Sequence, residues 1–173
     1  MKQLRVKAYL VLVMGTLVTA GVVHFIRSSC LHGMPSAGLP GVPGENLDSA
    51  KVEADIREAV FRNEMQGLSS HVFLQINGQD PDLSFMTRFK DFSPPPKPSS
   101  QSTTGEWLRV LDAETREPGV LLMADGIKWA KKSCVEVEGG WQNAGLSGGG
   151  YRYTVKCRNG KWRVTDKQHT WDS

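Results

Sequence analysis

The strongest constraint on the fold is a period of two in the C-terminal third of the chain. Val135 and Val137 alternate with Glu136 and Glu138, and the same period runs through YRYTVK at residues 151–156. Successive side chains of a strand point to opposite faces of a sheet, so each stretch has one apolar and one polar face. The pattern predicts an antiparallel sheet with one buried face.

Turn dipeptides separate these strands. Asp125-Gly126 and Asn159-Gly160 accept the positive φ that two-residue hairpin turns require. We therefore expect a meander of sequential antiparallel strands. The predicted strands span residues 107–112, 119–124, 127–131, 134–142, 150–157 and 161–167.

An amphipathic helix is predicted ahead of the sheet, over residues 49–66. Val52, Ile56 and Val60 recur every fourth residue among charged neighbours, and Gly67 is a natural end. Such an apolar stripe packs on the apolar face of a sheet. The sequence therefore predicts an α+β fold in which a long helix lies against a curved antiparallel meander.

The segment between this helix and the meander is predicted to hold a strand at 71–76 and a short helix. Asp80 is the expected N-cap of that helix, with Pro81 at its first position. The proline cluster at 94–98 ends the helix and begins a stiff connection.

The N-terminus predicts a membrane anchor. Residues 8–26 are uncharged and rich in Leu and Val, with basic residues on both sides. At 1.5 Å per residue this run spans about 28 Å, close to the roughly 30 Å hydrocarbon core. Residues 1–27 are therefore predicted to be a single-pass signal anchor that contacts the membrane through residues 8–26. The excess of basic residues before the run directs the C-terminal domain out of the cytoplasm.

Two other interpretations of this segment stay open. Val18 and Ala20 are small enough for signal-peptide cleavage, which would make the protein secreted. Cys30 lies where a lipidated cysteine could lie, although Arg27 departs from the lipoprotein pattern.

Composition divides the rest of the chain. Residues 28–47 are rich in Pro and Gly and are predicted to be an extended tether, which leaves 48–173 as one globular α+β domain. The net charge is +3, but residues 1–27 hold four basic and no acidic residues, so the remainder carries −1. A domain this close to neutrality lacks the field that gathers phosphates, which argues against nucleic-acid binding.

A family resemblance is carried by EVEGGWQNAGLSGGGYRYTVKCRNGKWRV at residues 136–164, with His169 and Trp171, and by IREAVFR at 56–62. These stretches resemble uncharacterised bacterial exported or membrane-anchored proteins. The order of a long helix and a curved sheet resembles the cystatin-like or NTF2-like roll. The resemblance covers roughly 48–173 and implies a fold without a particular chemistry.

Aromatic residues are the first candidate site. If they share the concave face of the sheet they could line a cavity for a small apolar ligand, although such residues also form ordinary cores. The candidates are Trp107, Trp129, Trp141, Tyr151, Tyr153 and Trp162.

Cysteines are the second. Cys134 and Cys157 come opposite one another if their strands pair, which invites a disulfide. However, Cys134 shares its strand parity with Glu136, whereas Cys157 shares its parity with Val155, so a bridge needs a β-bulge. The alternative is a buried Cys157 and a partly exposed Cys134.

The other chemical groups are interpreted as structural. The four histidines lack metal-ligand spacing, and no cofactor motif is found. Glu136 and Glu138 are expected to pair with basic residues across the strands. The glycine-rich loop at 145–150 is no phosphate loop, and a role as a mobile lip over a pocket stays open.

These features favour a non-catalytic module for binding or assembly, held outside the cytoplasm, with a protein partner or a small apolar ligand. The alternative is an NTF2-like ligand-binding or enzymatic domain with a pocket between helix 49–66 and the sheet. Neither interpretation includes a metal or a cofactor.

Overall fold

Helix α1 (Leu47–Glu64) opens the part of the chain that the computed structural model describes, residues 47–172. Its bounds agree with the predicted helix to within two residues. The predicted anchor at 8–26, and the predicted tether apart from residue 47, lie outside the described residues and stay predictions. In residues 47–172 no helix has the length and apolar character needed to cross a membrane.

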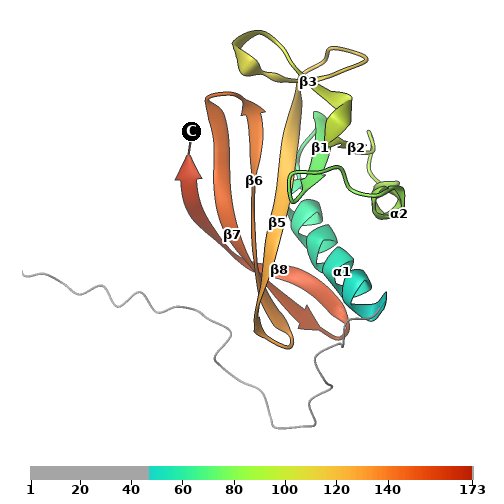
Figure 1. Ribbon diagram of the computed structural model, residues 1–173, viewed down its shortest axis with the longest axis vertical. Coiled ribbons are helices and arrows are strands. Elements are labelled where there is room, and N and C mark those ends of the chain that lie inside the picture. The colour runs from blue at the N-terminus through green and yellow to red at the C-terminus, as the bar shows by residue number, and fades with distance from the viewer. Residues whose placement is uncertain (1–46, 173) are drawn as a thin grey trace, which may run out of the picture. The chain divides into compact units, whose positions relative to one another are not determined.

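The architecture is α+β, with a mostly antiparallel curved sheet on which α1 packs (Figure 1). Six strands lie in the order β2-β1-β5-β6-β7-β8, and β3 and β4 form a separate two-stranded sheet. After α1 the elements are β1 (His71–Ile76), α2 (Leu83–Met86), the 3-10 helix η1 (Thr87–Phe89), β2 (Lys97–Pro98), η2 (Ser99–Gln101), β3 (Ser102–Thr104), η3 (Glu106–Leu108), β4 (Val110–Asp112), β5 (Gly119–Lys131), β6 (Cys134–Ala144), β7 (Ser147–Arg158) and β8 (Lys161–Asp172).

The predicted meander is confirmed for β5 to β8, which pair antiparallel in sequence order. Asn159 and Gly160 have positive φ between β7 and β8, as the turn prediction requires. The other side of the sheet is parallel: β1 pairs with β5 and also with β2. Parallel pairing needs a long crossover, which the segment between β1 and β5 provides.

The turn predicted at Asp125-Gly126 is wrong. Strand β5 runs through these residues, and its pairing with β6 skips one position between Ala124 and Ile127. This irregularity is a β-bulge, in which an extra residue bends the strand without reversing it. The same dipeptide suits a bulge and a hairpin turn, and the partner strand decides between them.

The start of the short helix also differs from the prediction. The N-cap of α2 is Asp82, whose carboxylate accepts a hydrogen bond from the Phe85 N–H at 2.7 Å. Asp80 instead accepts hydrogen bonds from the Ser99 hydroxyl and the Ser100 N–H. Asp80 therefore fixes the chain after β2 rather than the helix.

The core lies between α1 and one face of the sheet. Ile56 and Val60 of α1 are fully buried, as are Val137, Tyr153 and Val155 of the sheet. The helical and strand periods predicted these positions, and their burial confirms the packing of the helix on the meander.

The segment with α2 and η1 is held on α1 by rings and charges. Phe85 and Phe89 stack edge-to-face on Phe61. Arg62 binds both carboxylate oxygens of Asp91 at 2.8 and 3.1 Å, and Arg88 binds acids of α1. The Asp91 hydrogen bonds raise the pKa of Arg62 above its ordinary value.

Candidate functional site

Five of the six predicted aromatic site residues share the face of the sheet that packs against α1. Register places Tyr153 opposite Val137, Trp129 opposite Val135 and Tyr151 opposite the β6 residue Gly139. Trp129 and Trp162 stack edge-to-face at 5.8 Å between ring centroids. The sixth, Trp107, lies in η3 outside the sheet. Neither pocket described below is lined by any of the six, and ligand binding by them stays a prediction.

The cysteine prediction is not met. Cys157 is a free cysteine, so it makes no disulfide with Cys134. Register places Cys134 opposite Lys156 and Cys157 opposite Trp162. The alternative prediction, a buried Cys157 and a partly exposed Cys134, is also wrong. Cys134 is the buried cysteine, and Cys157 is half-buried. Cys134 keeps the regular register of β6 with β7, on the same face as Glu136, so it is buried on the face that its parity predicts to be polar.

The polar face of the sheet carries the predicted cross-strand charge pairs. The Arg152 guanidinium lies 4.0 Å from a carboxylate oxygen of Glu136 and 3.7 Å from one of Glu138. These three side chains and the bulge of β5 line an open pocket of about 240 Å³. Because its acids already face a cation, this pocket has little unpaired charge to offer a ligand.

Glu64, Lys167, Tyr151 and Tyr153 gather where α1 meets β7 and β8. The Lys167 ammonium lies 2.8 Å from a Glu64 carboxylate oxygen and 3.7 Å from the centroid of the Tyr151 ring. The buried Tyr153 hydroxyl has no hydrogen-bond partner among the described residues. Burial, and then the Glu64 charge, raise the pKa of Tyr153 above its usual value. This group joins the helix to the sheet, and we assign it a structural role.

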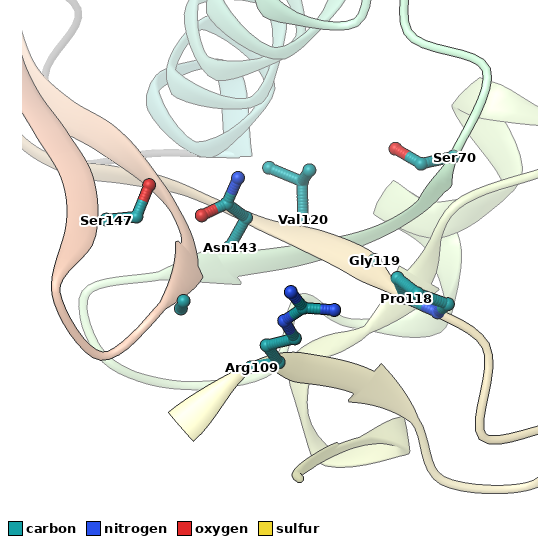
Figure 2. A pocket seen from close by; sticks show the side chains of 8 residues that line it. Ser70, Arg109, Pro118, Gly119, Val120, Asn143 and Ser147 are labelled. Atoms are coloured by element: carbon teal, nitrogen blue, oxygen red, sulfur yellow. The ribbon is translucent and has the colours of Figure 1, made fainter. Parts of the chain in front are cut away.

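The stronger candidate is a pocket of about 470 Å³ at one end of the sheet. On one side lie Ser70, which precedes β1, and Pro118, Gly119 and Val120 at the start of β5. On the other side, the end of β6 supplies residues 143 and 144, and the start of β7 supplies residue 147. Figure 2 shows the Arg109 side chain pointing into the space between these two sides. Arg109 is the only charged residue in the lining.

An exposed apolar surface borders this pocket, and we name it the tip surface: Trp107, Leu108 and Leu146. Trp107 and Leu146 are each 86% exposed, and Leu108 is 59% exposed. Leu108 packs so closely on the β6–β7 turn that a Cβ on Gly145 would overlap its side chain. This contact joins η3 to the turn, so the three apolar residues and Arg109 belong to one end of the domain.

The backbone of η3 is strained at the tip surface. Trp107 and Leu108 both have φ of 57°, in the left-handed region that bulky residues rarely occupy. Hydrogen bonds from the Gly105 N–H to the Arg109 carbonyl and from the Arg109 N–H to the Glu106 carbonyl close the turn. Two successive residues in this region cost roughly 1–3 kcal/mol each, and such strain concentrates at ligand-binding positions.

A buried carboxylate fixes the chain beside the pocket. Asp112 is fully buried and accepts hydrogen bonds from the Glu114 and Thr115 N–H groups. Its other oxygen lies 2.7 Å from the Lys97 ammonium and 3.8 Å from His71 Nδ1. Lys97, and next the Thr115 N–H, lower the pKa of Asp112 to about 2. The ionised Asp112 therefore ties β4 to β2 through Lys97.

Sequence reasoning missed the pocket and most of the tip surface. The predicted strand at 107–112 included Trp107 and Arg109, whereas β4 begins only at Val110. The predicted loop at 145–150 is also shorter, since β7 begins at Ser147. Gly145 is the one residue that hints at a close approach, and nothing in the sequence identifies Leu108 as its partner.

Fold and site together define an α+β domain with an open pocket and an apolar surface at one end of its sheet. Comparisons with protein-family models, curated proteins and solved structures found no match to this chain. The resemblance to a cystatin-like or NTF2-like roll stays a prediction. Within residues 47–172 no group of three His, Cys, Asp or Glu side chains is placed to hold a metal ion.

Proposed function

We propose that this protein is a non-catalytic binding module, anchored in the membrane through residues 8–26, whose domain binds a protein partner outside the cytoplasm. The tip surface is the binding surface. The observation that carries this proposal is the exposure of Trp107, Leu108 and Leu146 beside the Arg109 pocket.

Exposed apolar side chains have a cost when nothing covers them. Single apolar residues on a surface are ordinary, but a cluster beside a pocket is typical of interaction sites. Trp and Arg are also the residues that most often dominate binding energy at protein interfaces. Both residue types occur here within three consecutive positions, 107–109.

The hydrogen-bonded and closely packed backbone of the tip surface supports the same function. Strain at Trp107 and Leu108 is maintained by the turn hydrogen bonds and by the contact with Gly145. A surface that is already ordered loses less entropy on binding, so its contacts contribute more of their energy to affinity.

A pocket between helix and sheet is the less supported alternative. The side chains at that interface, including Phe61, Tyr153 and Val155, are fully buried against one another. Neither described pocket includes any of them.

The partner is tested by site-specific photocrosslinking of the full-length chain in its native host. A photoreactive residue replaces the exposed Glu106, and Leu146→Ala is then added. Leu83→Ala is the matched control, because Leu83 is 84% exposed on α2 and Leu146 is 86% exposed at the tip. We expect one discrete adduct that falls about tenfold with Leu146→Ala, the loss of a typical interface hot spot, and stays unchanged with Leu83→Ala. Equal adducts in the two variants, or no adduct in the chain that carries the photoreactive residue alone, would overturn the proposal.

Anchoring is tested separately by fractionation and intact mass. We expect to recover the chain in the membrane at its uncleaved mass. A soluble product shortened by about 20 residues would instead establish cleavage and secretion.

A further inference from the structure

Four polar side chains that line the Arg109 pocket lack partners in the described part of the chain. Arg109, Asn143, Ser147 and Ser70 make no side-chain hydrogen bond or ion pair within residues 47–172. They come from three separate parts of the fold and surround one space (Figure 2). A few convergent polar groups in a pocket of this size are typical of a ligand site.

Charge selects the class of ligand. Arg109 is the only charged residue in the lining. Two neighbouring acids already have partners of their own: Glu117 lies 2.6 Å from His71 Nε2, and Asp112 lies 2.7 Å from the Lys97 ammonium. The guanidinium is thus left to bind an anion. Its planar, forked donors match a carboxylate, which can accept two parallel hydrogen bonds from it.

Shape selects which carboxylate. The rest of the lining is apolar or backbone: Pro118, Gly119, Val120 and Ala144. A C-terminal residue carries a carboxylate and an apolar side chain on the same Cα, so it satisfies both parts of the lining at once. An Asp or Glu side chain offers the carboxylate alone. The volume of about 470 Å³ accommodates one or two residues.

We propose that this pocket binds the C-terminal carboxylate of a partner chain that ends in an apolar residue. Arg109 binds the carboxylate, while Asn143 and Ser147 donate hydrogen bonds to it and to the last peptide group. The residues before the terminus extend over the tip surface. This inference rests on the proposed function, because it names the partner group that the binding module recognises.

The test uses the full-length chain in detergent micelles and three synthetic peptides as probes. The first is acetyl-alanyl-alanyl-leucine with a free C-terminal carboxylate, and the second is its C-terminal amide. The third ends in aspartate amide, so that its only carboxylate is on a side chain. Binding is measured by NMR titration of the backbone amides of residues 109, 120, 143 and 147. Arg109→Gln is the test variant, and Arg163→Gln is its control, since Arg163 is an exposed arginine in β8.

We expect the free carboxylate to bind about tenfold more tightly than either amide, as loss of one charge-assisted hydrogen-bond pair predicts. Arg109→Gln should remove this preference, and Arg163→Gln should leave it. Equal binding of the first two probes, persistence of the preference in Arg109→Gln, or no binding at millimolar concentration would overturn the proposal. If the aspartate peptide binds as tightly as the first peptide, the pocket does not select a C-terminal carboxylate, and that part of the proposal would be overturned. If Leu146→Ala still lowers crosslinking about tenfold in any of these cases, the binding module stands and only the pocket assignment fails.

Discussion

Replacing Tyr153 by phenylalanine should make the protein more stable. The Tyr153 side chain is 0% exposed, and its hydroxyl has no hydrogen-bond partner among the described residues. Folding therefore removes the hydroxyl from water without compensation, at a cost of about 1–3 kcal/mol. The ring itself is well packed: its centroid lies 6.1 Å from that of Tyr151. Phenylalanine keeps the ring and removes the uncompensated group.

The expected gain is roughly 1–2 kcal/mol, because the small void left by one oxygen offsets part of the relief. For a domain of this size, each kcal/mol raises Tm by about 3–5 °C. Urea unfolding followed by tryptophan fluorescence, with thermal melts at pH 7, measures the change in the full-length chain. Tyr151→Phe is the control. Tyr151 is only half-buried, so water can satisfy its hydroxyl and the free energy of unfolding should change little.

The opposite sign would refute this reasoning. If the Tyr153 hydroxyl donates to the Glu64 carboxylate, phenylalanine destabilises the protein by about 1 kcal/mol. An alkaline titration adds a second check. Burial raises the pKa of Tyr153 in the folded state, so above about pH 10 only the unfolded chain ionises at this residue. The free energy of unfolding of the wild type should therefore fall as the pH rises above about 10, in part because Tyr153 ionises in the unfolded chain. Tyr153→Phe should remove that part of the fall.

Two further predictions concern the sheet and the Asp112 network. Val137→Asp places a carboxylate in the core opposite Tyr153 and should cost at least about 4 kcal/mol, whereas Glu138→Ala on the polar face should change stability by less than about 0.5 kcal/mol. Equal tolerance in denaturant melts would contradict the assigned faces. Asp112→Asn should lower stability at pH 7, because the folded pKa of Asp112 is about 2 and its contribution is present above the unfolded pKa of about 3.9. The difference from wild type should shrink as the pH falls from about 4 towards about 2, and a constant difference in acid melts would rule out this linkage.

Local periodicity was enough to predict the centre of the fold. The alternation around Val137 and Tyr153 identified the buried face of β6 and β7, and the spacing of Ile56 and Val60 identified the helix that covers it. Asn159-Gly160 marked a turn because its neighbours on both sides are strands of one hairpin. These features depend on residues close in sequence, so the sequence alone contains them.

Pairing between distant strands was outside the reach of periodicity. The parallel addition of β1 to β5 and the bulge at Asp125 depend on which strand lies alongside. The parallel pairing leaves the local alternation intact, whereas the bulge shifts it by one residue, so that Ala124 and Ile127 lie on the same face.

By itself, the sequence determined the helix, the meander and the face on which they meet, and it predicts an N-terminal anchor that the described residues do not include. Only the tertiary structure decided where the candidate site lies. Leu108 and Gly145 are far apart in the chain, and their contact places Arg109 beside the β6–β7 turn. None of these residues belongs to a motif, because a binding surface made from several loops requires only that the fold bring suitable side chains together.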